Sequence, residues 1–343
     1  MPSVVAHKSK DVGIVVADNA SNDDSLDFLR KHYPDVRIIS LEQNLGYAGG
    51  YNAALEQIDA AYYVLANNDL EMPPGCLEPL LQSMEAHSDV AAISPKVLSY
   101  RERNHFEYAG AAGGFIDAYG MPFCRGRIFN HCEEDRGQYQ EVCECFWATG
   151  AFVMLRADAF RAVGGFDEEL FAHMEEIDLC WRLKNRGYRI LCNPNSSVYH
   201  LGGGTLSQVH ARKTYLNFRN SLIVSIKNDP RKAFAMRLLI RMLLDGLGAI
   251  HLLFSRGPFH FVAVLRAHFY LYRHFGSIWR KRKAEQRLSD AHPPYGLYTR
   301  SIALSHFFRK RERFDQLESS KFIKRSESDA SAAYARPELP SSK

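Results

Sequence analysis

Short apolar runs alternate with helical patterns along residues 12–95. The runs at 12–18, 36–41, 62–65 and 90–95 have the length and composition of buried strands. The segments between them open at turn or capping residues and are long enough for short helices. Strands that alternate with helices form βαβ units. The order therefore predicts an α/β fold with a mostly parallel sheet flanked by helices.

The composition changes along the chain and predicts three parts. Residues 1–228 carry the strand and helix patterns and are expected to form the domain that holds the chemistry. Residues 229–290 show amphipathic helical patterns with many Arg, Lys and His residues. Residues 291–343 are expected to be a partly disordered tail, because their last part is rich in Ser, Ala and charged residues.

The cysteine count and the apolar content favour a reduced, cytoplasmic setting. Seven cysteines in a long chain without a leader pattern are unlike the disulfide framework of a small secreted protein. No uncharged apolar run reaches the ~18 residues expected of a membrane-spanning helix. The net charge of +4 is too small to indicate a nucleic-acid partner.

The basic region at 229–290 allows two interpretations. Apolar residues recur there between basic ones, and Trp279 is followed by the basic run 280–283. Such helices suit the surface of an anionic bilayer, which would make the protein peripheral on the inner face of a membrane. The alternative is an amphipathic pair of helices packed on the first domain.

Polar residues at strand ends are the first candidates for chemistry. Asn67-Asn68-Asp69 follows the run at 62–65, and Asp18 ends the run at 12–18. Parallel sheets bind ligands at the carboxyl ends of their strands. A carboxylate beside side-chain carbonyls offers oxygen ligands to Mg²⁺ or Mn²⁺, which bridge phosphates. The alternative for Asn67-Asn68-Asp69 is an Asx turn that closes the strand.

His200 ends a short predicted strand and precedes the glycines at 202–204. A neutral imidazole is a good ligand for Mn²⁺, and glycines let backbone approach a bulky polyanion. The alternative is a surface histidine before a flexible loop.

An acidic cluster opens the helix predicted within 170–186. Glu175, Glu176 and Asp178 are close enough to repel, so one of them is expected to have a raised pKa and to act as a general base near neutral pH. The alternative is an acidic helix start favoured by the helix dipole. Arg182 follows one turn later and can pair with an acid or face a phosphate.

Two further stretches are candidates for binding a phosphorylated ligand. The loop with Asn44, Gly46 and Asn52 is typical either of close backbone approach to a ligand or of a plain helix start. It is not a dinucleotide fingerprint. Lys213 and Arg219 can neutralise a diphosphate or form a solvated helix face.

In this order, the motifs resemble glycosyltransferase family 2, the inverting transferases with the GT-A fold. The likeness covers residues 12–225 and is closest to the rhamnosyltransferase-like branch that builds bacterial surface polysaccharides. The matching stretches lie at Asp18-Asn19, Asn44 to Asn52, Asn67 to Asp69, Trp147 to Gly150, Gly164 to Asp167, Glu175 to Arg182, and Tyr199-His200.

The resemblance implies a role for each candidate on the donor side. Asp18 would contact the nucleobase with Asn19 nearby, and the other nucleotide-binding residues would be Asn44, Gly46, Asn52 and Asn68. Asp69 would bind the divalent metal, Mg²⁺ or Mn²⁺, with His200 as a further ligand. Asn67 stands at the first position of the family's D-x-D motif and would be a weaker ligand than Asp.

The resemblance also implies the chemistry. Trp147 and Gly150 would line the acceptor side, and Arg182, Lys213 and Arg219 would face the diphosphate or the acceptor. Glu176 stands at the position of the family's base, with Glu175 and Asp178 as alternatives. The base would deprotonate a hydroxyl of a saccharide or lipid-linked acceptor. That hydroxyl would displace the diphosphate from a nucleotide-diphosphate sugar, with rhamnose among the candidate sugars.

One departure from the family keeps a non-enzymatic function open. The family has a strand and a helix before the Asp18 strand, and roughly 25 residues of such a βαβ unit either lie upstream of Met1 or are missing from the protein. A sheet without that strand would have an unfilled place beside Asp18 and a lower nucleotide affinity. This departure motivates one alternative, a truncated, inactive scaffold at a membrane. A separate alternative is another sugar-nucleotide enzyme on a similar sheet, such as a nucleotidyltransferase, although such enzymes usually carry a Gly-rich, basic signature after the first strand and this sequence has none.

Overall fold

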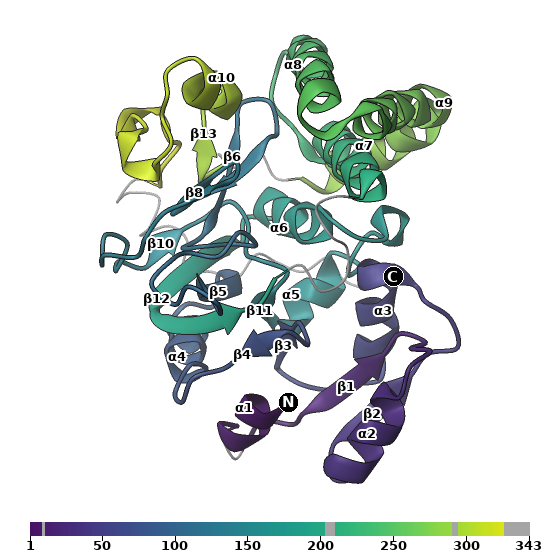
Figure 1. Cartoon of the computed structure of the whole chain (residues 1–343), viewed down its shortest axis with the longest axis vertical. Coiled ribbons are helices and arrows are strands. Elements are labelled where there is room, and N and C mark those ends of the chain that lie inside the picture. Colours follow the sequence, from purple (N-terminus) through teal and green to yellow (C-terminus); the bar gives the residue numbers. More distant parts are fainter. Residues whose placement is uncertain (9–10, 203–209, 290–293, 326–343) are drawn as a thin grey trace.

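The computed structural model describes residues 1–8, 11–202, 210–289 and 294–325. Its centre is a six-stranded sheet in the order β10-β12-β5-β11-β3, with β4 paired to β12 (Figure 1). The strands of this central sheet are β3 (Tyr62–Ala66), β4 (Leu70–Glu71), β5 (Val90–Ser99), β10 (Cys143–Glu144), β11 (Phe152–Arg156) and β12 (Arg189–His200).

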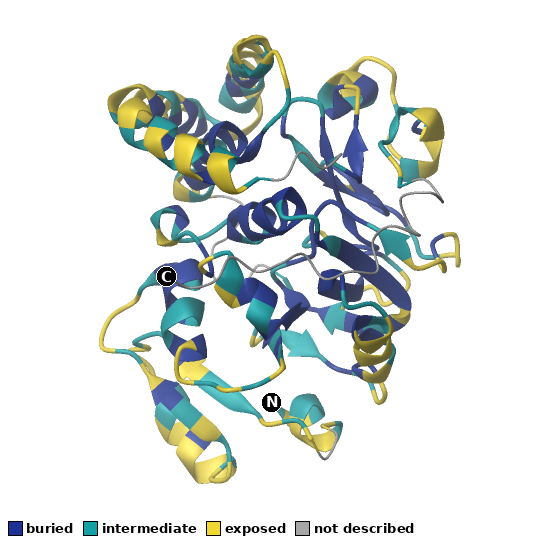
Figure 2. Ribbon diagram, turned by 180° about the vertical axis from the view of Figure 1, so that it is seen from behind, coloured by how far each residue is buried: buried dark blue, intermediate teal, exposed yellow. Residues whose placement is uncertain are grey.

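Helices cover both faces of the central sheet. The helix α4 (Glu78–Ala86) buries Leu80 and Met84 against one face, where Ile93 of β5 also points. The opposite face packs against α5 (Ala157–Ala162) and α6 (Glu175–Asn185). Successive residues of β11 alternate between the two cores, as the pleat of a strand requires. Figure 2 shows the sheet and α6 as the most buried part of the molecule.

A separate two-stranded unit holds the N-terminal strands. The strands β1 (Val15–Asp18) and β2 (Arg37–Ser40) pair in parallel. Within the described residues, β1 pairs with no strand on its other edge. The helices of this region are α1 (Pro2–Ala6), α2 (Ser25–His32) and α3 (Gly46–Leu55). The expectation of a buried strand at 12–18 is wrong for β1, because only Asp18 of this strand is buried.

A second sheet has the order β13-β6-β7-β8-β9. The strand β13, near the end of the chain, runs parallel to β6, so residues 294–325 fold back onto this sheet. The remainder of the predicted tail, at 326–343, lies outside the described residues. The elements of this part are β6 (Gly114–Asp117), β7 (Pro122–Cys124), β8 (Arg127–Ile128), β9 (His131–Cys132), β13 (Leu297–Tyr298), α10 (Ile302–Phe307), η2 (Phe314–Gln316) and η3 (Ser319–Lys321).

Three helices follow the central sheet. The helix α7 (Ala211–Asn228) packs against α6 on one side and against α9 (Pro258–Leu288) on the other. The helix α8 (Phe234–Arg256) packs on α9 at the outer edge of the molecule (Figure 1). By length and composition, α8 could cross a membrane, which differs from the expectation that no run here is suitable.

The alternation from β1 to β5 follows the prediction, but the direction of several strands does not. The β1–β2 and β5–β12 pairs are parallel, whereas β11 runs antiparallel to both β3 and β5, and β4 antiparallel to β12. The central sheet is therefore mixed rather than mostly parallel. An apolar run has the same composition in either direction, so the direction is set by where the chain returns from the second sheet.

Candidate active site

The pairing of β4 with β12 brings Asp69 and His200 together. His200 is the register partner of Leu70, the residue after Asp69. Asp69 Oδ1 lies 3.0 Å from His200 Nε2, and the Leu201 amide donates to the Asp69 carbonyl at 3.0 Å. Two residues far apart in the sequence thus meet at one sheet edge. Gly202 follows directly, and the residues at 203–209, which include two of the predicted glycines, lie outside the described residues.

A second carboxylate lies on the other side of the His200 ring. Glu107 Oε2 is 3.0 Å from His200 Nδ1, in an ion pair that is not aligned as a hydrogen bond. The Ala109 amide holds the same carboxylate at 2.6 Å. Burial opposes a charge on His200, but the two carboxylates outweigh it and raise the pKa of His200 to about 9. The hydrogen bond from His200 lowers the pKa of Asp69.

This arrangement fits a divalent metal with only two protein ligands. Among the described residues, no group of three His, Cys, Asp or Glu side chains forms a metal cage. Asp69 supplies a hard oxygen, and His200 supplies Nε2 when Glu107 holds the proton on Nδ1. The buried Nδ1 has no aligned hydrogen-bond partner in the described part of the chain, so a small ring rotation toward Glu107 would satisfy it.

Asn67 and Asn68 contribute less to this edge than their motif position suggests. The backbone N–H of Asn67 donates to the Ala151 carbonyl at 3.0 Å, which fixes the end of β3. Asn68 is exposed to solvent. Neither side chain has a hydrogen bond that orients it toward His200 among the described residues, and the pair Asp69–His200 carries the site.

We expect Glu107→Gln to weaken Mn²⁺ binding about 10- to 100-fold, the range found for carboxylates that orient a ligand histidine. The amide keeps the size of the side chain but loses the charge that holds the Nδ1 proton. Mn²⁺ affinity measured by electron paramagnetic resonance tests this without any turnover. The control is Glu102→Gln, an exposed carboxylate in the same loop. Equal affinity in Glu107→Gln and the native protein would contradict the role of Glu107.

The acidic cluster lies at the start of α6 and is largely buried. Burial raises the pKa of Glu176 to about 7. Glu175 is 5% exposed, and its pKa is raised well above its usual range by burial and by the charge of Glu176. The Oε2 atoms of both have no hydrogen-bond partner among the described residues. A half-buried carboxylate with such a pKa and a free oxygen is suited to accept a proton.

Asp178 and Arg182 form an ion pair with each other. Asp178 is completely buried and accepts hydrogen bonds from Arg182 Nε at 2.8 Å and Asn228 Nδ2 at 2.7 Å. Lys227 forms a further ion pair with it. Burial opposes the charge of Asp178, but Lys227 and Arg182 outweigh it and lower its pKa. Arg182 also donates to two backbone carbonyls. The expected pairing of Arg182 with an acid of the cluster is thus observed, the pair anchors α6, and the structure does not favour Asp178 as the base or Arg182 as a phosphate ligand.

The loop before the acids has an uncommon backbone. Phe171, His173 and Met174 have φ values of 62°, 69° and 74°, in the left-handed region that non-glycine residues rarely adopt. Asn220 of α7 is fully buried, and its amide donates to the carbonyls of Leu170, Ala172 and His173 at 2.7–2.9 Å. These bonds hold the loop in this conformation, and the loop places Glu175 and Glu176 at the start of α6.

The segment at Gly150 and Ala151 lies between Glu176 and the Asp69–His200 pair. Tyr47 donates from its hydroxyl to the Gly150 carbonyl at 2.7 Å. A Cβ at Gly150 would lie 3.7 Å from the Cβ of Glu176. The next residue, Ala151, accepts the Asn67 amide described above. Gly150 therefore lies next to Glu176, the base candidate. Its neighbour Ala151 bonds to Asn67, two residues before Asp69.

The candidates for the nucleotide form a second group at the end of β1. Asn19 donates from Nδ2 to the Gly46 carbonyl at 2.8 Å and to Asn44 Oδ1 at 3.3 Å. Gly46 has φ +73°, and a side chain there would collide with Phe171. Asp18 is buried and accepts weak bonds from the Ser21 amide. The structure thus brings Asp18, Asn19, Asn44 and Gly46 together.

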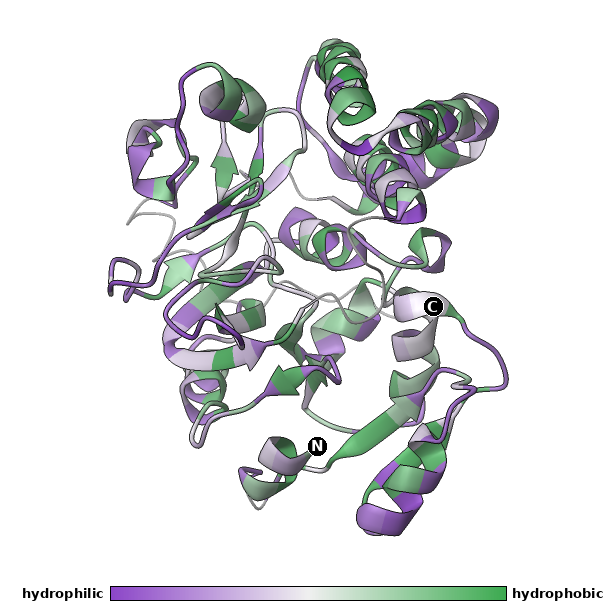
Figure 3. Ribbon diagram, viewed as in Figure 1, coloured by the Kyte–Doolittle hydropathy of each residue, from purple (hydrophilic) through white to green (hydrophobic). Residues whose placement is uncertain are grey.

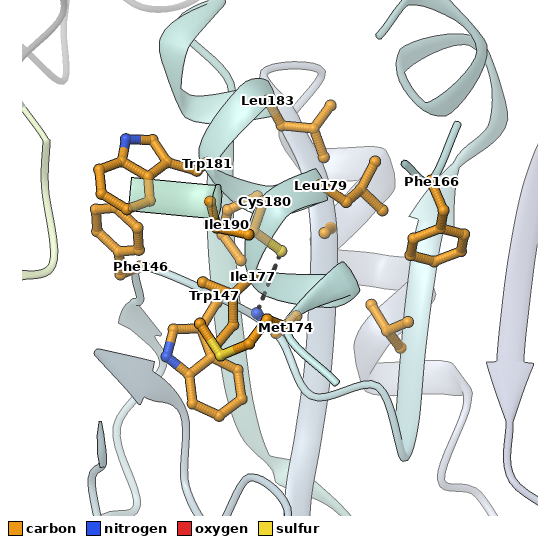
Figure 4. Packing of buried hydrophobic residues seen from close by; sticks show 14 of the residues in the cluster. Phe146, Trp147, Phe166, Met174, Ile177, Leu179, Cys180, Trp181, Leu183 and Ile190 are labelled. Carbon is orange, nitrogen blue, oxygen red and sulfur yellow. Dashed lines mark hydrogen bonds between the residues drawn. The ribbon is translucent and has the colours of Figure 1, made fainter. Parts of the chain in front are cut away.

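Three other candidates form hydrogen bonds with the protein itself. The Asn52 side chain bonds to the backbone of Phe166 in both directions and to Glu168. Trp147 is 3% exposed and donates to the Phe115 carbonyl, within the core around α6 (Figure 4). Arg219 donates to the Glu169 and Leu170 carbonyls. Most of their polar atoms bond within the fold, so the structure favours structural roles for these residues.

Lys213 is the basic residue that stays near the site. It is half-buried, and the pKa of its ammonium is lowered by burial, raised by Glu107 and lowered by Arg256. The same ammonium lowers the pKa of His173, after the larger effect of burial.

Residues 2–164 match the family model described as "Glycosyl transferase family 2". The matched segment, 163 of the 343 residues, is therefore similar to glycosyltransferase family 2. The segment contains β1 to β11, including Asp18 and Asp69, while His200 and the acidic cluster lie beyond it. The expected family is therefore confirmed.

Curated relatives carry related names. The chain is 28% identical over 207 residues to the N-acetylglucosaminyl-diphospho-decaprenol L-rhamnosyltransferase of Mycobacterium tuberculosis. That match covers 55% of this chain and 66% of the relative, just under two thirds of its length. This chain is also 27% identical over 196 residues to the O-antigen biosynthesis protein RfbC of Myxococcus xanthus. That match covers 54% of this chain and 14% of RfbC.

The fold is also found among solved structures. A crystal structure of GalNAc-T7 with UDP, GalNAc and Mn²⁺ superposes with a TM-score of 0.55 at 13% sequence identity. The match covers 82% of this chain and 50% of GalNAc-T7. At this identity the likeness establishes the fold alone, and it confirms the expected GT-A architecture.

Proposed function

We propose that the protein is an inverting glycosyltransferase that moves a sugar from a nucleotide-diphosphate donor to a hydroxyl of an acceptor. One observation carries the proposal. Glu176 is a half-buried carboxylate with a pKa of about 7, and it lies next to Gly150. The segment after Gly150 bonds to the end of β3, just before Asp69, which is paired with His200. The segment with Asp69 matches the family 2 model. A single displacement at an anomeric carbon needs a general base for the acceptor hydroxyl and positive charge to stabilise the leaving diphosphate.

In the proposed mechanism each protein group has one task. The group at Asp18, Asn19 and Asn44 holds the nucleoside. Glu176 accepts the proton of the acceptor hydroxyl, whose oxygen then bonds to the anomeric carbon as the bond to the diphosphate breaks. A divalent metal held by Asp69 and His200, Mg²⁺ or Mn²⁺, would neutralise charge on the leaving diphosphate. Lys213 contributes a further positive charge near this edge.

The relatives guide the choice of substrates. The mycobacterial relative is named for transfer of L-rhamnose to a lipid-linked sugar diphosphate, and the Myxococcus relative for O-antigen biosynthesis. We propose a sugar donor of this kind, with rhamnose as one candidate. The acceptor would be a saccharide or lipid-linked saccharide in bacterial surface polysaccharide synthesis. The protein would work in the cytoplasm, peripheral on the inner face of the membrane.

Metal-dependent nucleotide binding tests the proposal. Calorimetric titration with a panel of nucleoside diphosphates should show one that binds with Mn²⁺ and much more weakly without it. In Asp69→Ala we expect the Mn²⁺-dependent binding to weaken about 100-fold, equivalent to about 2.7 kcal/mol. The matched control is Asp59→Ala, whose carboxylate is fully exposed.

The outcomes separate the competing functions. If no nucleoside diphosphate binds with Mn²⁺, the transferase proposal fails and the scaffold alternative stands. If a sugar phosphate and a nucleoside triphosphate yield a nucleotide sugar and pyrophosphate, the protein is instead a nucleotidyltransferase. Release of nucleoside diphosphate together with a glycosylated acceptor supports the transferase.

A further inference from the structure

The hairpin of α8 and α9 exposes large apolar side chains along both helices. We define the hairpin face by six of them, Leu243, Leu247, Phe254, Phe259, Val262 and Phe269, each between 47% and 84% exposed. Their spacings of three, four and seven residues within each helix place them on one side of that helix. Figures 2 and 3 show exposed and hydrophobic segments along both helices.

The inward side of the same helices is fixed to the protein by polar contacts. Arg241 and Asp245 form a buried ion pair at 2.8 Å, and Arg241 also donates to Ser221 of α7. His260 bonds to Thr214 of α7 at 2.8 Å. In α8, only 17% of the apolar window is buried, unlike a core helix. Because Arg241 ties α8 to α7, and Asp245 ties it to His268 of the neighbouring α9, we infer that α8 lies in a membrane surface rather than across it.

The charges around the hairpin face have one sign. Asp245 and Glu285 are the only carboxylates between residues 231 and 288, and both are buried. The exposed charges of the same stretch are basic, at Lys232, Arg256, Arg266, Arg273, Arg280, Lys283 and Arg287. A second copy of this face would bring like charges together, whereas anionic lipid headgroups would pair with them.

The turn of the hairpin lies at the N-terminal end of α7. Phe254 and Phe259 flank this turn at 84% and 78% exposure. His260, just after the turn, bonds to Thr214 in the first turn of α7 at 2.8 Å. The most exposed apolar end of the hairpin therefore lies at the same end of α7 as Lys213, the neighbour of Thr214.

We propose that α8 and α9 form an in-plane docking surface for an anionic lipid bilayer. The hairpin face enters the boundary between headgroups and acyl chains, and the basic residues contact the lipid phosphates. Docking in this way would bring the active-site edge near the headgroups, where a lipid-linked acceptor presents its sugar. This last point alone rests on the proposed transferase function.

Vesicle co-sedimentation of the full chain tests the surface. We expect binding to vesicles of phosphatidylcholine and phosphatidylglycerol in equal parts, and much weaker binding to pure phosphatidylcholine. The double variant Phe254→Ser with Phe259→Ser should lose at least about tenfold in affinity for the anionic vesicles. The double variant Arg273→Gln with Arg280→Gln should lose about 25-fold, at about fivefold for each basic residue. Phe28→Ser, an exposed aromatic on α2, is the matched control and should bind as the native chain does.

Three results would overturn the proposal: no binding of the native chain to anionic vesicles, unchanged binding of the phenylalanine variant, or a dimer that this variant dissociates. The last, seen by analytical ultracentrifugation, would assign the face to a second copy. Transfer to a water-soluble acceptor should be unchanged in both variants. Vesicle binding without transfer would therefore count against the proposed function alone, and transfer without vesicle binding against the docking surface alone.

Discussion

Glu176→Gln is expected to abolish sugar transfer and to leave nucleotide binding intact. The amide has almost the same shape as the carboxylate but cannot accept the proton of the acceptor hydroxyl. Loss of a general base costs about 10²- to 10⁴-fold in rate, so we expect kcat to fall by about 1,000-fold. The measurement is steady-state turnover, combined with calorimetric titration of the donor nucleotide with Mn²⁺.

The pH profile gives an independent measure of the same base. Burial raises the pKa of Glu176 to about 7. A base works only when deprotonated, so kcat/KM of the native enzyme should be low below this pKa and rise as the pH increases through about 7. This ascending limb should be absent from any residual activity of Glu176→Gln.

Glu175→Gln is the matched control for Glu176→Gln. Burial and the charge of Glu176 raise the pKa of Glu175, which disfavours its charged form, and the amide keeps the shape of the side chain. We expect kcat within about tenfold of native, because only a neighbouring group is altered. Loss of turnover in Glu175→Gln with retention in Glu176→Gln would transfer the role of base to Glu175.

Asn220→Ala should reduce both the free energy of unfolding and kcat. The carbonyls of Ala172 and His173 would lose this partner, whereas the Leu170 carbonyl keeps Arg219 and the Ala172 backbone amide, and a buried polar group without a partner costs about 1–3 kcal/mol. We expect the free energy of unfolding to fall by about 3 kcal/mol. Release of the left-handed loop would displace Glu176, and a misplacement of ~1 Å costs about 100-fold in kcat.

A second buried asparagine separates positioning from stability. Asn193 is 4% exposed and donates to the Pro79 carbonyl and to Ser83, on the side of the sheet that α4 covers. Asn193→Ala should lower the free energy of unfolding by a similar amount and leave kcat unchanged. Urea denaturation and turnover at a temperature where both variants are folded give the two values. If Asn220→Ala is destabilised with kcat near native, Asn220 serves stability alone.

Local patterns were sufficient to place the main candidates in the fold. Apolar period and turn signals located β1, β2, β3 and β5 and the end of β12, and the strand-end positions of Asp18, Asp69 and His200 followed from those boundaries. The basic amphipathic pattern located the helices that became α8 and α9. These inferences depend on residues close in sequence, for which periodicity and capping are direct physical signals.

The sequence by itself determined which acids stand at the start of α6 and which residues end the strands, but only the tertiary structure decided which of them are free. Asp178 and Arg182 look as reactive as Glu176 in the sequence, yet they satisfy each other and the backbone. Glu107 has no motif, and it became relevant because the fold places it against His200. A polar side chain is available for chemistry only if no distant partner satisfies it, and such partners are set by long-range packing rather than by local pattern.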